Sequence, residues 1–170
     1  SYGIPSDTLR FVKDIAPGSS KSSFPSELIE FQDKLFFSAN DGVHGEEPWI
    51  SDGTEAGTYM LKNINEEPGE VPYHSYPHGF FVTEDLLYFA ADDGIHGTEL
   101  WQTDGTTEGT KMTADVWPSS NQGSDPGGFG QVGDYLIFNA WYSKRTLFRL
   151  KLGGSSASAV REFYMASPLF

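Results

Sequence analysis

The sequence predicts an all-β protein of the β-propeller type, built from three four-stranded antiparallel blades. The pattern Glu-x-Trp-x-x-Asp-Gly-Thr-x-x-Gly-Thr occupies residues 47–58 and returns at residues 99–110, so the chain contains a repeat with an offset of 52 residues. Its 19 glycines and 10 prolines suit many turns between short strands. Apolar or alternating runs recur between these turns, and no stretch keeps a helical period. Four short strands in a repeat of this length are typical of a propeller blade.

The chain begins with a segment that we interpret as the last strand of an incomplete repeat. Residues 9–15 alternate apolar and polar side chains, which is the period of a half-buried strand. They match residues 58–64 and 110–116, both of which lie at the end of the repeated pattern. We therefore expect residues 1–15 to form an N-terminal strand that completes or continues a blade.

Each blade is predicted to begin with a hairpin. A Ser-x-Pro sequence precedes every hairpin, and proline suits the entry to a strand because it has no amide proton to donate. The second strand of each hairpin carries a continuous apolar string, Leu-Phe-Phe, Leu-Tyr-Phe or Leu-Ile-Phe, which indicates burial on both faces. The expected strands span residues 27–31 and 34–39, 79–82 and 86–91, and 128–132 and 135–140.

A tight loop and a strand with a tryptophan follow the first two hairpins. Residues 40–45 and 92–97 each contain two glycines three positions apart after Asn or Asp, which predicts a turn with positive φ. The next strand carries Trp49 or Trp101 and ends at the Asp-Gly-Thr turn. We interpret both tryptophans as packing residues between blades, in preference to a sugar-stacking surface.

The third unit departs from this pattern. After residue 140 the Asp-Gly-x-His-Gly loop is absent, Phe148 stands where tryptophan would be, and a Gly-Gly-Ser-Ser linker replaces Asp-Gly-Thr. A terminal repeat that differs from its neighbours is expected to cap the array or to dock on a partner. The predicted units are residues 16–64 for blade 1, 65–116 for blade 2, 117–164 for a degenerate blade 3 and 165–170 for a C-terminal tail.

The repeated string, together with residues 87–98 and 13–20, resembles the family of ELWxxDGT-type repeats, with about 2.5 to 3 copies in this chain. The resemblance covers most of residues 9–140 and fades beyond them. Members of that family are typically large, exported, multi-repeat chains regarded as propellers. The resemblance therefore implies a propeller architecture and an extracytoplasmic location, which would be secreted, periplasmic or in an organelle lumen. It implies no catalytic activity.

Charge is distributed unevenly along the chain. A net charge of −13 argues against nucleic acid as a partner, because phosphates would be repelled. Residues 141–170 nevertheless carry five Lys or Arg residues and a single acid, Glu162. A basic, aromatic end on an acidic body suggests docking to a protein, either a second copy or a larger complex, although a solvated face has the same charge pattern. The apolar runs are too short for a transmembrane segment, and the chain has no cysteine for disulfides or zinc–thiolate sites.

Candidate binding residues come from two segments that lie outside the repeated pattern. The first segment is the insert at residues 71–78, which occurs once, and the second is the basic end. The candidates from the insert are Tyr73, His74, Tyr76 and His78, and those from the basic end are Trp141, Lys144, Arg145 and Arg149. The acidic loops offer weak calcium candidates, namely Asp41, Asp92 and Asp93. Because the alternating Asp ladder of a calcium loop is absent, we expect no metal or other cofactor.

The polar residues that recur in the repeat are interpreted as structural. Asp52 and Asp104 suit Asx turns, and His44 and His96 suit anchors of a tight loop. A catalytic residue has no reason to recur in every blade, and no serine or cysteine nucleophile has a recognisable signature. The sequence therefore predicts that the protein is not an enzyme, and a hydrolase stays open only because propellers often hold active sites in their central channel.

The functional prediction is a non-catalytic interaction or structural accessory module that docks through its basic aromatic C-terminal part. The alternative is a secreted carbohydrate- or calcium-binding module that uses the loops of one propeller face. Three blades are too few to close a propeller, which takes about four to eight. We expect either a two-fold dimer with six blades, in which residues 9–15 complete the third blade of the partner, or a position within a larger assembly.

Overall fold

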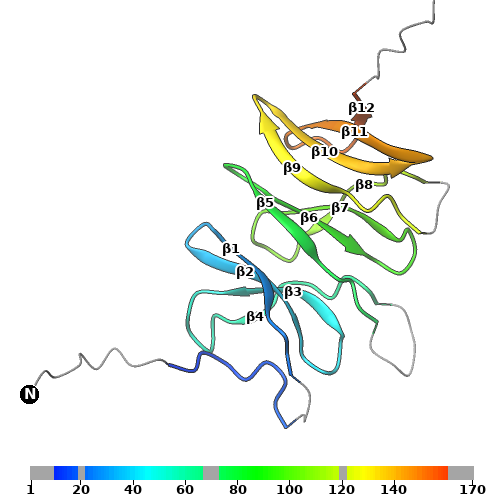
Figure 1. The fold of residues 1–170 in the computed structure, drawn as a ribbon. Helices are drawn as coiled ribbons and strands as arrows, with labels where there is room; N and C mark the ends of the chain where they lie inside the picture. Colours follow the sequence, from blue (N-terminus) through cyan, green and yellow to red (C-terminus); the bar gives the residue numbers. More distant parts are fainter. Residues whose placement is uncertain (1–9, 19–21, 67–72, 119–121, 161–170) are drawn as a thin grey trace, which may run out of the picture.

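The chain folds into three antiparallel sheets of four strands each (Figure 1). The structure is a computed structural model and describes residues 10–18, 22–66, 73–118 and 122–160, in which no helix occurs. Each sheet is a meander in which every strand pairs with the next strand along the chain. The predicted all-β class and the three four-stranded antiparallel units are therefore confirmed. None of the described residues forms a helix that could cross a membrane.

The strand bounds agree with the predicted hairpins to within one or two residues. Sheet 1 contains β1 (Ser26–Phe31), β2 (Lys34–Asn40), β3 (Glu46–Ser51) and β4 (Tyr59–Met60). Sheet 2 contains β5 (His78–Val82), β6 (Leu87–Asp92), β7 (Thr98–Thr103) and β8 (Lys111–Ala114). Sheet 3 contains β9 (Gly127–Val132), β10 (Tyr135–Tyr142), β11 (Lys144–Lys151) and β12 (Ser158–Ala159).

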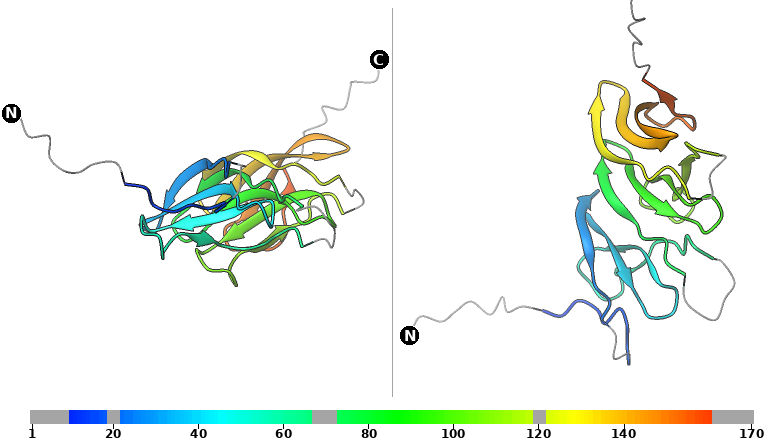
Figure 2. Two further views of the ribbon diagram at one scale, coloured as in Figure 1. Left: turned by 90° about the horizontal axis from the view of Figure 1, so that it is seen from below. Right: turned by 45° about the vertical axis from the view of Figure 1, so that its right-hand side comes forward.

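The three sheets stack in chain order, as Figure 1 and the right view of Figure 2 show. The first strands of successive sheets lie against each other, β1 against β5 and β5 against β9. Each sheet thus has one face toward the start of the stack, its N-side face, and one toward the end, its C-side face. Among the described residues, no further sheet lies on the C-side face of sheet 3 or on most of the N-side face of sheet 1.

Apolar clusters between the sheets hold the stack together. Neighbours in each apolar string point to opposite faces, so Phe36 packs against sheet 2 while Phe37 faces the N-side. Trp101 lies between sheets 1 and 2, which confirms its predicted packing role, and Phe148 takes the equivalent place between sheets 2 and 3. Trp49 does not lie between two sheets of the described residues and packs instead with Ile15 on the N-side face of sheet 1. The first cluster buries Phe31, Phe36, Ile50, Leu61, Ile64, Leu87, Phe89, Ala91 and Trp101. The second buries Tyr88, Leu100, Ala114, Val116, Leu136, Phe138, Ala140, Phe148 and Leu150.

The glycine loops between the second and third strands have the predicted positive φ. Gly45 and Gly97 adopt φ values of 87° and 73°. A Cβ on Gly45 would lie 2.1 Å from the carbonyl oxygen of Tyr73, and one on Gly97 would lie 2.3 Å from the amide nitrogen of Gly123. Glycine is therefore required at both positions for two reasons: the backbone has a positive φ, and the segment that enters the next sheet passes too close to leave room for a Cβ.

The prediction of an N-terminal strand at residues 9–15 is wrong in its hydrogen bonding. Residue 9 and those before it lie outside the described residues, and residues 10–14 are assigned to no strand. The physical reason is that the described residues contain no sheet before this segment with which its backbone could pair. The segment instead lies across the N-side face of sheet 1, where Ile15 joins a buried cluster with Phe37, Ala39 and Trp49.

The fourth position of sheet 3, which this segment is predicted to fill in a partner, is held in the single copy by a strand of the same chain. β12 of the same chain pairs there with β11, through Phe148↔Ala159 and Arg149↔Ser158. Residues 161–164 of the predicted fourth strand and the predicted tail, residues 165–170, lie outside the described residues. The missing glycine loop has a clear consequence: β10 and β11 turn directly at Ser143, whose φ is 59°, and both strands are eight residues long.

Candidate functional site

The Asp-Gly-Thr turns are built around their carboxylates. Oδ1 of Asp52 and Oδ1 of Asp104 each accept hydrogen bonds from the amide at 2.9 Å and the hydroxyl at 2.7 Å of the threonine two residues on. The hydroxyl bond is the largest of the effects that lower the pKa of both carboxyls. A Cβ on Gly57 or Gly109 would fall 2.0 Å from these carboxylates. The two aspartates are therefore parts of the turn, as their recurrence predicts.

The calcium candidates also hold their own loops. Oδ1 of Asp41 and of Asp93 accepts the amide of the histidine three residues on, and Oδ2 lies 2.7 Å from the Nδ1 of that histidine. Burial opposes ionisation of both aspartates, but the hydrogen bonds from His44 and His96 outweigh it and lower the pKa. Oδ1 of Asp92 accepts the amide of Gly94 at 2.7 Å. Within the described ranges no three His, Asp or Glu side chains come together in a group that could hold a metal.

The loop candidates brace the junction between sheets 1 and 2. The ring of His74 stacks on that of Tyr76 with centroids 4.9 Å apart, and its Nδ1 accepts the amide of Glu46 at 3.0 Å. Nδ1 of His78 lies 2.8 Å from the carbonyl oxygen of Tyr76. The rings of Tyr73 and Tyr76 remain exposed at the surface. These contacts give the loop a structural task, and the two tyrosine rings stay accessible.

Asp125 joins the loop candidates to the candidates of the basic end. Its Oδ1 lies 3.5 Å from Nε2 of His78, and its Oδ2 accepts a hydrogen bond from Nη1 of Arg145 at 3.0 Å. The Arg145 guanidinium also lies over the Trp141 ring, 5.9 Å from the centroid, and its Nε donates to Asn139 Oδ1. The sequence placed Asp125 only at the start of a repeat, and nothing in its spacing marked it as a link.

The remaining basic candidates lie on β11 near aromatic residues of β10. The Arg149 guanidinium is 5.3 Å from the centroid of the Tyr135 ring, and Arg149 is paired in register with Ile137. Lys144 begins β11 and is paired with Tyr142 beside the tight turn. The Arg145 and Arg149 guanidinium groups are thus both within the range of a cation–π contact with an aromatic ring of β10.

The C-side face of sheet 3 is therefore an exposed surface of mixed apolar, aromatic and cationic side chains. Alternate residues of β10 and β11 point inward into the second cluster, which leaves the others on the outer face. The residues of this surface are Val132, Tyr135, Ile137, Trp141, Arg145, Leu147, Arg149 and Lys151. Leu147 is 49% exposed and Val132 is 67% exposed, although both are apolar.

Comparisons with known proteins leave the family unassigned. No family model matches the chain, and no curated protein matches it. Among solved structures, the computationally designed Ika4 protein matches 92% of this chain and 81% of its own length, at 13% identity and a TM-score of 0.48. The computationally designed Ika8 protein matches 81% of this chain at 13% identity and a TM-score of 0.44, and the chain spans 35% of its length. Likenesses of this size carry no argument about function.

Sequence reasoning missed two buried glutamates, although both begin the repeated pattern. Oε2 of Glu47 accepts hydrogen bonds from the Ile64 amide at 2.8 Å and the Ser75 hydroxyl at 2.7 Å. Oε2 of Glu99 makes the equivalent bonds to the Val116 amide and the Ser124 hydroxyl, at 2.9 and 2.6 Å. Burial raises the pKa of Glu47 to about 7 and also raises that of Glu99. The available signal was the recurrence of Glu with a serine 25 or 28 residues later.

Proposed function

We propose that the chain is a non-catalytic interaction module of the β-propeller type, which docks on a protein partner through the C-side face of sheet 3. The observation that carries this proposal is a change in exposure at equivalent positions. Phe36 and Tyr88 occupy one position of the repeat in sheets 1 and 2 and are at most 2% exposed, because the next sheet covers them. Ile137 occupies the same position in sheet 3 and is partly exposed.

A second position changes in the same way. Pro48 is buried and Leu100 is fully buried, whereas their counterpart Leu147 is half exposed. Apolar surface left in water is unfavourable by about 25 cal/mol per Å². Contiguous apolar patches with a polar rim mark interaction sites, and Trp, Tyr and Arg are enriched in them. The composition of this face therefore supports docking to a protein.

The propeller architecture is part of the proposal. Three successive meanders with their first strands side by side suit neighbouring blades, and a closed propeller takes about four to eight of them. The resemblance to ELWxxDGT-type repeats supports the same architecture and an extracytoplasmic location. The absence of catalysis is supported by the roles of the conspicuous Asp and His side chains, which hold turns in two successive sheets.

Affinity capture from the native source, followed by mass spectrometry, tests the proposal with matched baits. The Leu147→Asp variant places a charge at the centre of the face, and Ile95→Asp changes an apolar side chain of 66% exposure in a loop of sheet 2. We expect the wild type and Ile95→Asp to capture the same protein and Leu147→Asp to lose it. A partner retained by Leu147→Asp would place the docking surface elsewhere and overturn the proposal.

A further inference from the structure

We propose that the partner of this face is a second copy of the same chain. In this arrangement the C-side face of sheet 3 of one copy covers the N-side face of sheet 1 of the other, as each sheet covers the next within the chain. This inference rests on the proposed function and names its partner. It is carried by the N-terminal segment, by the pocket beside it and by the charges of the two outer sheets.

The N-terminal segment contacts sheet 1 as the end of sheet 1 contacts sheet 2. Lys13 Nζ donates to the carbonyl oxygen of Thr58 at 2.7 Å, and Lys62 Nζ donates to that of Thr110 at 3.0 Å. Lys13 and Lys62 are equivalent in the repeat, as are Thr58 and Thr110. The N-side face of sheet 1 therefore binds residues 10–15 in the way that the N-side face of sheet 2 binds the end of sheet 1.

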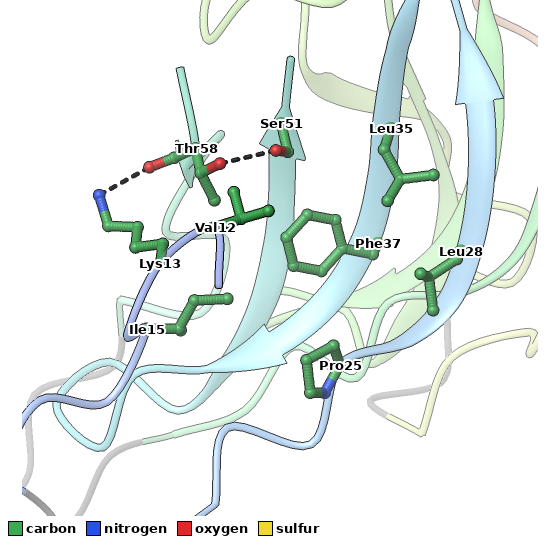
Figure 3. Close-up of a pocket in the computed structure, with 9 residues that line it drawn as sticks. All are labelled: Val12, Lys13, Ile15, Pro25, Leu28, Leu35, Phe37, Ser51 and Thr58. Atoms are coloured by element: carbon green, nitrogen blue, oxygen red, sulfur yellow. Dashed lines mark hydrogen bonds between the residues drawn. The ribbon is translucent and has the colours of Figure 1, made fainter. Parts of the chain in front are cut away.

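A pocket of about 200 Å³ lies between this segment and sheet 1. Figure 3 shows Val12 and Ile15 of the segment on one side, with Leu28, Leu35 and Phe37 of sheet 1 on the other. Leu28 is 59% exposed, whereas its counterparts in sheets 2 and 3 are only partly exposed. The pocket is thus an apolar opening on a face that no sheet of the described residues covers.

The equivalent space between sheets 1 and 2 is filled by the preceding sheet. The repeat places a matching set of four residues between sheets 1 and 2. The counterparts of Val12, Ile15, Leu35 and Phe37 there are Leu61, Ile64, Leu87 and Phe89. Phe36 packs in one buried cluster with these four counterparts. In sheet 3 the position of Phe36 is taken by Ile137, which points out of the stack. Ile137 of a second copy is therefore the side chain that the repeat places in the pocket.

The charges of the two outer sheets are complementary. Residues 26–60, which contain sheet 1, hold eight acids and one lysine. Residues 127–160, which contain sheet 3, hold one acid and four Lys or Arg residues. Glu30 is exposed on β1, and Arg149 and Lys151 lie on the outer face of β11. Head-to-tail docking brings these opposite charges together, whereas docking of two identical faces would oppose like charges.

Two copies joined in this way place six sheets in one ring, which lies within the range of closed propellers. Arg10 and Phe11 are the counterparts of Tyr59 and Met60 in β4, and in the ring they reach the edge of β11 that β12 occupies. β12 is paired through two residues whose side chains are both exposed. Its replacement by the N-terminal segment of the partner therefore breaks few hydrogen bonds.

Sedimentation velocity over a range of concentrations tests the inference with two complementary variants. Leu28→Asp blocks the N-side face of sheet 1, and Leu147→Asp blocks the C-side face of sheet 3. We expect the wild type and Ile95→Asp to form dimers, and each face variant alone to dimerise at least about tenfold more weakly, since a charge is buried. An equimolar mixture of the two face variants should recover association, because one interface of the mixed dimer is intact.

Salt provides a second measurement that needs no variant. Raising the salt from about 50 mM to about 500 mM should weaken the wild-type dimer, because the attraction between the outer sheets is screened. A wild type that stays monomeric, or a mixture that associates no better than its components, would overturn the inference. If the wild type stayed monomeric but Leu147→Asp abolished capture of a different protein, the proposed function would survive and only the identity of the partner would be wrong. If Leu147→Asp lost neither dimerisation nor capture, both proposals would be refuted.

Discussion

Replacement of Glu47 by glutamine is expected to remove a specific loss of stability at neutral pH. Glu47 is fully buried, and its burial raises the pKa of the carboxyl from 4.5 to about 7, despite the hydrogen bonds that Oε2 accepts from Ser75 and Ile64. Among the described residues Oε1 has no hydrogen-bond partner. The folded protein therefore holds a proton on this side chain that the unfolded chain releases above pH 4.5.

The sign follows from the raised pKa. The folded state binds the proton more tightly than the unfolded state, so the stabilising contribution is complete below pH 4.5 and is lost as the pH rises through about 7. The difference between the two pKa values corresponds to about 3 kcal/mol in the free energy of unfolding. That is a large share of the total for a domain of this size.

Urea denaturation at pH 5 and at pH 8 measures this contribution. We expect the free energy of unfolding of the wild type to fall by about 2.5 kcal/mol more than that of Glu47→Gln between the two pH values, because part of the contribution is already lost at pH 5. Glutamine keeps a carbonyl oxygen for the Ile64 amide and the Ser75 hydroxyl but cannot ionise. Glu99 and His96, whose pKa values are also raised, titrate equally in both proteins and cancel in the difference.

Glu84→Gln is the matched control, since Glu84 is an exposed glutamate in the turn between β5 and β6, away from both outer faces. It should leave the pH dependence of the wild type unchanged. Equal pH dependence in the wild type and in Glu47→Gln would refute the reasoning, because it would mean that the buried carboxyl does not hold its proton in the folded state.

Two further predictions concern the repeated loops and the contacts between sheets. Gly97→Ala should destabilise the protein by about 3 kcal/mol or more in thermal unfolding, because the added Cβ would meet the backbone of Gly123. The control Gly53→Ala has a similar φ of 85° and open space around it, so it should cost only about 1 kcal/mol. Similar losses of stability in the two variants would contradict the steric argument. Lys62→Met should cost about 1 kcal/mol in urea unfolding through loss of its bond to the Thr110 carbonyl, and an unchanged midpoint would show that this bond does not help to join the sheets.

The sequence predicted many individual residues of the candidate site, but it did not predict how they come together on one surface. The sequence marks Trp141, Arg145 and Arg149 as unusual, because the repeat ends before them and the local charge changes sign. It does not show that Asp125 holds Arg145, because these residues meet only when the entry to β9 lies beside the β10–β11 turn. The buried position of Glu47 was equally hidden, since a glutamate near the start of a strand is usually exposed.

By itself, the sequence determined the strands, their turns and the three repeating units. These features depend on local chemistry, namely apolar alternation, glycine at positive φ and Asp side chains that bind nearby amides. Only the tertiary structure decided which faces are covered, because burial depends on what stacks against a sheet. The position held by Phe36, Tyr88 and Ile137 is equivalent in all three sheets. It is closed in the first two and open in the third, because no fourth sheet of this chain follows in the described residues.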